Sequence, residues 1–316
     1  MLADPSECLK LLRCPRTKSE LIKVTDERLI SKVEENGRSN EYRIIDGKPI
    51  LIDFSDSVFS DEALFESLAG SEIERKEYNG FKKSVKHLLS PKKKSTAGNV
   101  DNLISELQKF ENPRVLVVGG GSIGQGMQPL YDDPRIQVIG FDVYASPHAQ
   151  FVADAHHIPL PDNAFDAVVI QAVLEHVLQP AEVADEIWRV LRPGGFVYAE
   201  TPFMQQVHEG PFDFTRFTES GHRYLFRKFE LISSGASGGP GRQFAWAVDY
   251  LVRGLFRSVT AGKLAKLAFF WTQYLDRFIP AEYAQDGASG VFFYGRKSTS
   301  TVSPKQIIGH YKGAQR

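Results

Sequence analysis

Short apolar runs separated by polar segments dominate the chain from Pro113 onward. Most of these runs are rich in Val, Ile and Phe, and several segments between them are compatible with helix. Runs of this length and composition are typical of buried strands, and their alternation with helices predicts a parallel sheet covered on both faces. The fold class is therefore predicted to be α/β. The runs, in chain order, are VLVVG, QVIGFD, FVADA, AVVIQAV, FVYAET, FELISS and SGVFFYGRK.

The first 54 residues follow a different pattern, which predicts a small α+β unit. CLKLLRCP has helical spacing, SELIKV resembles a strand, and YRIIDGKPILIDF predicts two short strands around the turn Asp46-Gly47-Lys48. Residues 55–100 are polar and are expected to form a linker and lead-in segment, with the lysines at 92–94 solvated. Helical spacing resumes in NLISELQKF, within a large domain expected over 101–300 and followed by a tail over 301–316.

A long insertion, expected over residues 235–285, separates the last two predicted strands. FAWAVDYLVRGLF and LAKLAFFWTQYLDRF each place apolar residues on one helical face, and cations exceed acids in this region. Two interpretations stay open. The helices cap the sheet edge on the acceptor side, or they lie on an anionic membrane face as basic amphipathic helices do.

Composition and charge exclude few classes of protein. The 316 residues are 42% hydrophobic and 24% charged with a formal net charge of -1, so no nucleic-acid partner is expected. Cys8 and Cys14 are too few for a disulfide framework or a four-thiolate zinc site, and no metal site is expected. The N-terminal stretch lacks the pattern of a secretory signal, and no apolar run reaches the length of a membrane span. We therefore expect a cytoplasmic protein, with peripheral contact at the inner face of the membrane through the insertion as the alternative.

Residues suited to ligand binding follow five successive predicted strands. Because ligands of parallel sheets bind at the carboxyl ends of the strands, these residues are expected along one edge. They are Gly119 to Gly124, then Asp142, then Asp154-Ala155, then Gln171 with Glu175-His176, and last Glu200-Thr201-Pro202.

The glycine cluster alone admits more than one ligand. Glycines let a ligand approach the backbone, and the following helix start attracts an anion. That anion can be the pyrophosphate of a dinucleotide or the carboxylate of a methionine moiety, and Asp142 would hold ribose hydroxyls in either case. A tight turn without a ligand is the third interpretation.

The stretch from about residue 113 to 202 resembles the class I S-adenosylmethionine-dependent methyltransferases, in particular their broad type-11-like group. The resemblance is carried by Asp154-Ala155, Pro159 to Asp166, Leu174-Glu175-His176 and Leu191 to Gly195. It implies a Rossmann-like sheet of seven strands and S-adenosylmethionine as the methyl donor.

The resemblance also implies roles for single residues. Gly119, Gly120 and Gly121 would face the methionine part of the donor. Asp142 would bind the ribose, Asp154 the adenine amino group and the Ala155 amide a ring nitrogen. Apart from the resemblance, His176 is a second candidate for catalysis, but we expect it to line the donor pocket at a helix start. Val117 departs from the pattern, because many members carry an acid there. A backbone carbonyl or Gln171 is expected to replace that acid.

The small N-terminal unit resembles the zinc-ribbon family that includes activating partners of tRNA methyltransferases. Cys14-Pro15 matches the start of that ribbon, but Thr17 stands where the second thiol would be. A degenerate unit without metal, held by packing, is therefore expected.

The loop after the fifth strand, TPFMQQVHEGPFDFTRFTESGHRYLF, is expected to hold the acceptor. It resembles the corresponding loop of methyltransferases of bacterial polysaccharide pathways. We expect His208 to act as the base on a hydroxyl, with Asp213 orienting it or Arg216 binding an anionic acceptor. The alternative is an Asp213–Arg216 ion pair and a histidine that only packs the lid.

The remaining histidines have other expected places. His156 and His157 are expected beside the adenine, and His222 is expected near a helix start capped by Thr218.

These patterns together predict a methyltransferase that uses S-adenosylmethionine, with O-methylation of a glycan or a related small-molecule hydroxyl as the expected reaction. Two alternatives remain open at this stage. One is an NAD-dependent oxidoreductase with the same glycine fingerprint, and the other is a non-catalytic, methyltransferase-like binding partner.

Overall fold

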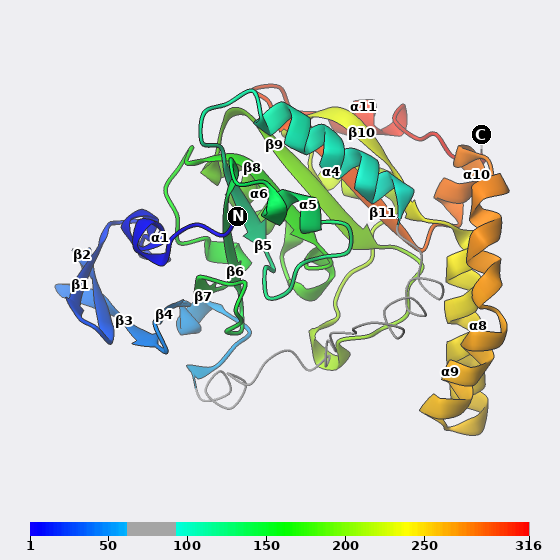
Figure 1. Ribbon diagram of the computed structural model, residues 1–316, viewed down its shortest axis with the longest axis horizontal. Coiled ribbons are helices and arrows are strands. Elements are labelled where there is room, and N and C mark those ends of the chain that lie inside the picture. The colour runs from blue at the N-terminus through cyan, green and yellow to red at the C-terminus, as the bar shows by residue number, and fades with distance from the viewer. Residues whose placement is uncertain (62–92, 316) are drawn as a thin grey trace.

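The computed structural model describes residues 1–61 and 93–315. Their strands form one mixed sheet in the order β1-β2-β3-β4-β7-β6-β5-β8-β9-β11-β10 (Figure 1). The strands are β1 (Leu21–Thr25), β2 (Arg28–Glu35), β3 (Arg38–Ile45), β4 (Lys48–Leu51), β5 (Arg114–Val118), β6 (Gln137–Asp142), β7 (Phe151–Ala153), β8 (Phe165–Gln171), β9 (Leu191–Pro202), β10 (Phe229–Gly238) and β11 (Gly290–Lys297).

The predicted α/β class is confirmed, but the count of seven strands is wrong for the described sheet, which has eleven. The seven strands expected from the apolar runs occupy one continuous stretch, from β7 to β10. The N-terminal strands lengthen that stretch because β4 pairs in parallel with β7, with Ile50 opposite Val152. This pairing satisfies backbone groups that β7 would otherwise expose as an edge strand.

Helices cover both faces of the sheet because the side chains of the parallel strands alternate between two cores. Leu116 and Val118 of β5 belong to the core shared with α1, α6 and α7, whereas Val115 and Val117 face α4 and α5. The helices are α1 (Pro5–Leu11), α4 (Lys94–Leu107), α5 (Gln128–Asp132), α6 (Pro180–Val190), α7 (Glu219–Leu225), α8 (Pro240–Phe256), α9 (Val259–Ala268), α10 (Ala281–Asp286) and α11 (Pro304–Ile308). The 3-10 turns are η1 (Phe54–Asp56), η2 (Ala155–His157), η3 (Leu174–His176), η4 (Gly210–Phe212) and η5 (Phe270–Phe278).

The N-terminal unit is a meander of four strands. The predicted turn between β3 and β4 is confirmed, because Asp46 and Gly47 have φ angles of 49° and 74°, the left-handed pair that a two-residue hairpin requires. Strand β2 was not predicted. It ends at a second turn of the same kind, at Asn36 and Gly37, whose φ angles are 54° and 74°.

The insertion between β10 and β11 is helical, as expected, and consists of α8, α9, η5 and α10 (Figure 1, yellow to orange). Many of its apolar side chains remain exposed, including those of Leu251, Leu255 and Phe256, which are 63–71% exposed. Within the described residues, every helix is too short or too polar to cross a bilayer.

Candidate active site

A cavity of about 360 Å³ opens at the carboxyl ends of β5, β8 and β9. Its walls come from the glycine turn after β5, from the ends of β8 and β9, and from the loop after β9. Residues that line the cavity include Lys93, Val117, Gly119, Gln171, Glu175, Glu200, His208 and Trp246.

The glycine turn after β5 has no room for side chains. Gly119 has a φ angle of 73°, and a Cβ atom there would lie 2.1 Å from Cγ2 of Val173. A Cβ atom on Gly121 would lie 2.6 Å from Oδ2 of Asp142, and one on Gly120 would lie 3.1 Å from Cα of Gly140. The backbone of the turn therefore comes close to any ligand that enters the cavity.

Asp142, at the end of β6, holds the glycine turn. Its Oδ2 atom accepts a hydrogen bond of 2.8 Å from the Gly121 amide, and its Oδ1 atom accepts one of 2.7 Å from the Val143 amide. The residue is 9% exposed and does not line the cavity described above. A carboxylate has about four lone-pair sites, so hydrogen bonds from ribose hydroxyls are compatible with these contacts.

Asp154, expected at the adenine, is already hydrogen-bonded through both oxygens. Oδ1 accepts from the His156 amide at 3.0 Å and lies 2.6 Å from His156 Nδ1, and Oδ2 accepts from Ser57 Oγ at 2.6 Å. Burial alone would raise the pKa of Asp154, but these hydrogen bonds lower it. Neither Asp154 nor the buried Ala155 lines the cavity.

The two histidines expected beside the adenine each contact an acid. His156 pairs with Asp154, and Nε2 of His157 lies 3.0 Å from Asp56, just after the N-terminal unit. Ser57 and Asp56 thus bring the segment after the N-terminal unit to the loop that follows β7. No local pattern indicates this contact, because the two segments are about a hundred residues apart.

Gln171 and Glu200 form a polar wall at the ends of β8 and β9. Gln171 Nε2 donates to Glu200 Oε2 at 3.1 Å, while Gln171 Oε1 is buried without a hydrogen-bond partner. Lys93 Nζ donates to the same Glu200 oxygen at 2.9 Å. Lys93 was expected in a solvated run and instead forms this ion pair. Lys92, also part of that run, lies outside the described residues.

Glu200 remains ionised in this wall although it is only 2% exposed. Burial disfavours its charged form, but the charge of Lys93 and hydrogen bonds from Thr96 and Tyr198 keep its pKa below the ordinary value. Val117, where an acid was expected by resemblance, also lines the cavity. Glu200 therefore supplies a carboxylate to the same cavity from a different strand, and the sequence prediction did not select it.

The loop after β9 is held closed by an ion pair. Arg216 binds both oxygens of Asp213, and Arg216 Nε donates to the Gln205 carbonyl at 2.9 Å. The Asp213 side chain is 1% exposed. Burial opposes its ionisation, but hydrogen bonds from Arg216 and from the His208 amide lower the pKa of Asp213 to about 2. The predicted residues His208, Asp213 and Arg216 thus lie together. Asp213 pairs with Arg216, and its Oδ2 atom also lies 3.2 Å from His208 Nδ1, so the predicted orienting contact and the ion pair of the alternative are both present.

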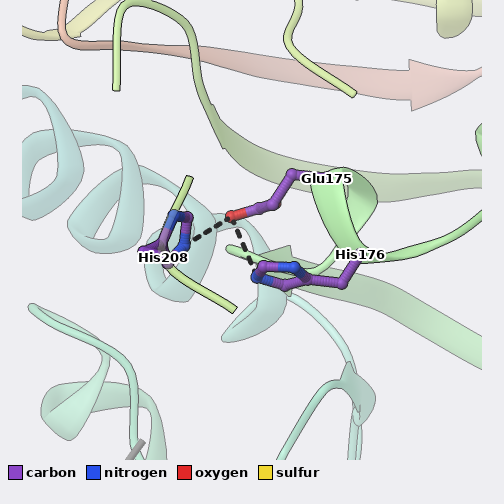
Figure 2. A group of neighbouring side chains, drawn as sticks. All are labelled: Glu175, His176 and His208. Atoms are coloured by element: carbon purple, nitrogen blue, oxygen red, sulfur yellow. Dashed lines mark ion pairs between the residues drawn. The ribbon is translucent and has the colours of Figure 1, made fainter. Parts of the chain in front are cut away.

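Glu175, His176 and His208 converge beside the cavity (Figure 2). Glu175 Oε1 lies 3.7 Å from His176 Nε2 and 3.9 Å from His208 Nε2. Burial raises the pKa of Glu175 to about 8, and burial also lowers the pKa of His176. His176 was predicted to line the donor pocket, and its ring instead packs edge-on against His208, with ring centroids 5.1 Å apart.

His222 lies in helix α7, whose N-cap is Thr218, as predicted. The residue is 1% exposed, and its Nε2 atom lies 2.9 Å from Thr201 Oγ1. Burial lowers the pKa of His222 to about 4. The histidine is therefore a neutral core residue beneath the end of β9.

Residues 116–199 match the family model described as a methyltransferase domain. This segment contains most of β5 to β9 and the loops between them, so the predicted methyltransferase domain is confirmed there, with S-adenosylmethionine as the donor of such domains.

Curated relatives match part of the chain. A demethylmenaquinone methyltransferase of Renibacterium salmoninarum is 35% identical over 138 residues, which are 40% of this chain and 54% of that protein. A protein of the same name from Clavibacter sepedonicus is 49% identical over 93 residues, or 28% of this chain and 33% of that protein. A Mycolicibacterium smegmatis protein named "Probable S-adenosylmethionine-dependent methyltransferase" is 38% identical over 98 residues, or 28% of this chain and 37% of that protein. The chain thus spans about half the length of the first relative and about a third of the other two.

Solved structures resemble the chain more distantly. A Haemonchus contortus phosphoethanolamine N-methyltransferase in complex with S-adenosyl-L-methionine is 15% identical, with a TM-score of 0.43 over 88% of this chain and 71% of that one. The [4+2]-cyclase SpnF is 19% identical, with a TM-score of 0.41 over 75% of this chain and 92% of that one. Because both TM-scores are low, neither likeness bears on activity.

Proposed function

We propose that the protein transfers a methyl group from S-adenosylmethionine to a hydroxyl oxygen of a glycan or a related hydroxylated small molecule. The observation that supports this most is the convergence of donor and acceptor groups on one cavity. Gly119 and Gln171 lie in the segment that matches methyltransferase domains, and His208 reaches the same cavity from the loop after β9.

The donor lies along the glycine turn in this proposal. Its methionine part contacts the backbone of residues 119–121, and its ribose binds Asp142. Its ammonium group lies near Gln171 Oε1, the buried acceptor atom that has no hydrogen-bond partner in the described residues. Glu200 adds a negative charge beside Gln171 and takes the place of the acid expected at Val117.

The acceptor hydroxyl lies between the donor and His208. Its oxygen attacks the methyl carbon in line with the sulfur, so that an O–CH3 bond forms while the S–CH3 bond breaks. The hydroxyl proton passes to His208 Nε2, and S-adenosylhomocysteine leaves as a neutral thioether. His208 Nδ1 lies 3.2 Å from both the Gln206 carbonyl oxygen and Asp213 Oδ2, two hydrogen-bond acceptors, so Nδ1 carries a proton and Nε2 is the basic nitrogen.

Calorimetric titration tests the donor site. The wild-type protein is expected to bind S-adenosylhomocysteine but not NAD, and Asp142→Ala is expected to weaken binding at least about 10-fold through loss of the ribose contacts. Asp133→Ala, an acid at the opposite ends of the strands, is the matched control. Binding of NAD instead would favour the oxidoreductase alternative.

A methyl-donor consumption screen tests the acceptor. It includes nucleotide sugars, lipid-linked sugars and a demethylated quinone, the last because the relatives are named demethylmenaquinone methyltransferases. Turnover with a hydroxylated sugar and its loss in His208→Ala, at unchanged donor affinity, is the expected result. Donor binding without turnover on any acceptor would favour the non-catalytic alternative.

We further propose that the N-terminal unit is a degenerate zinc ribbon that packs without metal. Cys14 Sγ lies 3.0 Å from the Tyr42 hydroxyl and accepts from the Thr17 amide at 3.4 Å. These groups occupy the position around the thiol that a metal would need. Zinc content of the isolated wild type and of Cys14→Ser tests this, and one tightly bound zinc per chain that Cys14→Ser loses would contradict it.

The helical insertion supports contact with an anionic bilayer, which suits a lipid-linked acceptor. In residues 240–278 the two acids, Asp249 and Asp276, face the inside of the insertion and hold Arg253 and the start of α8. Arg257, Lys263 and Arg277 are exposed near the exposed leucines and phenylalanines. A surface with apolar side chains and cations but without exposed acids fits anionic lipid headgroups.

Sedimentation with vesicles tests the membrane contact. The protein is expected to sediment with vesicles that contain anionic lipid and to be released by high salt, and Leu255→Ser with Phe256→Ser is expected to reduce sedimentation several-fold. Ile308→Ser removes an apolar side chain that is 79% exposed on α11, and is the control. Equal sedimentation of all three proteins, or none with anionic vesicles, would refute the contact.

A further inference from the structure

Glu175 places a carboxyl group in the interior of the protein. It is 0% exposed, and neither of its side-chain oxygens has a hydrogen-bond partner among the described residues. A buried polar group without a hydrogen-bond partner destabilises the folded protein unless a ligand or an ion binds it. The side chains nearest to Oε1 include the imidazoles of His176 and His208, both of which turn a ring nitrogen toward it (Figure 2).

The surroundings of the two histidines direct their Nε2 lone pairs toward Glu175. His176 Nδ1 lies 2.8 Å from the Phe212 carbonyl oxygen, which can only accept, so Nδ1 carries the proton. His208 Nδ1 faces two acceptors at 3.2 Å, Gln206 O and Asp213 Oδ2, which are closer than Arg216 Nη2 at 3.5 Å. A hydrogen bond from one ring nitrogen to a carbonyl or carboxylate is the usual support of a histidine that binds metal through the other.

We propose that Glu175, His176 and His208 bind one divalent transition-metal ion, of which Zn²⁺ is the expected occupant, through Glu175 Oε1 and the two Nε2 atoms. Two neutral imidazoles and one carboxylate are a donor set that suits Zn²⁺ and Co²⁺ better than Mg²⁺ or Ca²⁺. The three ligand atoms lie within 4.8 Å of one another. Ligands on a tetrahedral zinc ion lie about 3.4 Å apart, so small side-chain rotations complete the site.

The fourth coordination position faces the cavity, because Glu175 and His208 both line it. Three protein ligands and one open position are the arrangement of a catalytic rather than a structural metal site. This consequence rests on the proposed function: an acceptor hydroxyl that bound the ion would lose its proton more readily, and the proton would pass to water in the cavity, because the ion would occupy the lone pair of His208 Nε2. Metal binding itself does not depend on the identity of the donor.

Metal titration of the full-length protein tests the site. The wild type, stripped with EDTA and dialysed, is expected to bind one Zn²⁺ per chain by mass spectrometry of the metal, and to give the visible absorption of Co²⁺ bound to nitrogen and oxygen. Glu175→Gln keeps the shape of the side chain but removes its charge, and is expected to weaken Zn²⁺ binding at least about 100-fold. His208→Ala changes a loop residue and provides a second variant should Glu175→Gln fold poorly.

Matched controls are Glu182→Gln and His148→Ala, which make the same substitutions at residues outside the cluster. Both variants are expected to bind Zn²⁺ with the affinity of the wild type. A wild type that binds no ion, or variants at Glu175 and His208 that retain wild-type affinity, would overturn the inference. Titration of the stripped protein with S-adenosylhomocysteine separates the two proposals. Donor binding without metal binding would refute the metal site alone, and metal binding without donor binding would refute the proposed function alone.

Discussion

Gly119 illustrates how a single residue shapes the turn after β5 for two separable reasons. Its φ angle of 73° strains any other L-residue, and a Cβ atom would also overlap Val173. Gly194 has nearly the same φ angle, 74°, but open space around its Cα atom. The two positions therefore share the backbone strain and differ only in the overlap that a Cβ atom would make with a neighbouring side chain.

Alanine at these two glycines is expected to separate strain from overlap. Gly194→Ala should lower the free energy of unfolding by about 1 kcal/mol, from the left-handed backbone alone. Gly119→Ala should lower it by about 2–4 kcal/mol, because overpacking adds to that strain, and should also weaken S-adenosylhomocysteine binding. Urea unfolding and calorimetry check both values. Equal destabilisation by the two variants would show that Val173 moves aside without cost.

The loop after β9 is the element that brings His208 to the cavity. Its Asp213–Arg216 pair orders the backbone around His208, while the amides of Phe214 and Thr215 donate to the Glu175 carbonyl. The pair therefore positions His208 without contacting the donor turn.

Arg216→Gln is expected to loosen this loop. The change leaves the buried Asp213 carboxylate without the guanidinium that pairs with it. This loss is expected to destabilise the observed conformation of the loop by about 1–3 kcal/mol. Faster limited proteolysis near residues 205–216 and a lower kcat should result, at unchanged affinity for S-adenosylhomocysteine. Arg227→Gln, at an arginine outside the loop, is the control. A loop that resists protease as well as the wild type would contradict the role of the pair.

Helix α7 makes stability depend on pH through His222. Burial holds the pKa of this histidine at about 4 in the folded protein, below the value of about 6.5 expected in an unfolded chain. Between these two values the unfolded state binds more protons, so stability that is present above pH 6.5 is lost as the pH falls toward 4.

Replacing His222 should flatten that dependence. The wild type is expected to lose up to about 3 kcal/mol of unfolding free energy through this group between pH 7 and pH 4, and His222→Gln should lose correspondingly less. Urea unfolding at several pH values measures the difference, with His148→Gln as the control. Parallel pH curves for wild type and His222→Gln would refute the assignment.

At the scale of the whole molecule, the N-terminal unit and the methyltransferase segment share one core. Cys8, Leu29 and Leu51 belong to the same cluster of buried side chains as Phe151 of β7 and Val168 of β8. The sheet is continuous from β1 to β10, so the unit cannot separate without exposing β7.

One cooperative unfolding transition is therefore expected. Leu51→Ala leaves a cavity at a side chain that is 0% exposed and should cost about 2–5 kcal/mol, shifting the transitions of β3 and β8 together. Hydrogen exchange of peptides from the two strands across a urea series is the measurement. Ile22→Ala, at a side chain that is 47% exposed on β1, is the control. Separate midpoints for β3 and β8 in the wild type would show two independent domains.

Local patterns in the sequence were enough to predict the parallel strands, the sheet edge where the cavity lies and the glycine turn beside Asp142. These features depend on local hydrophobic periodicity and on the residues that directly follow apolar runs. Such patterns can be recognised within short windows of the sequence. The cap of helix α7 by Thr218 and the turn at Asp46-Gly47 belong to the same class of local signals.

Contacts between residues far apart in the chain required the folded structure. Glu200 reaches the same cavity as Val117 because β9 ends beside β8, and Lys93 reaches Glu200 across 107 positions of the chain. Glu175 and His208 come together because the loop after β9 folds back over η3. The joining of β4 to β7 is likewise non-local. Strand pairing and loop closure bring such residues into contact through the free energy of burying distant segments together, and no short-range pattern in the sequence encodes that outcome.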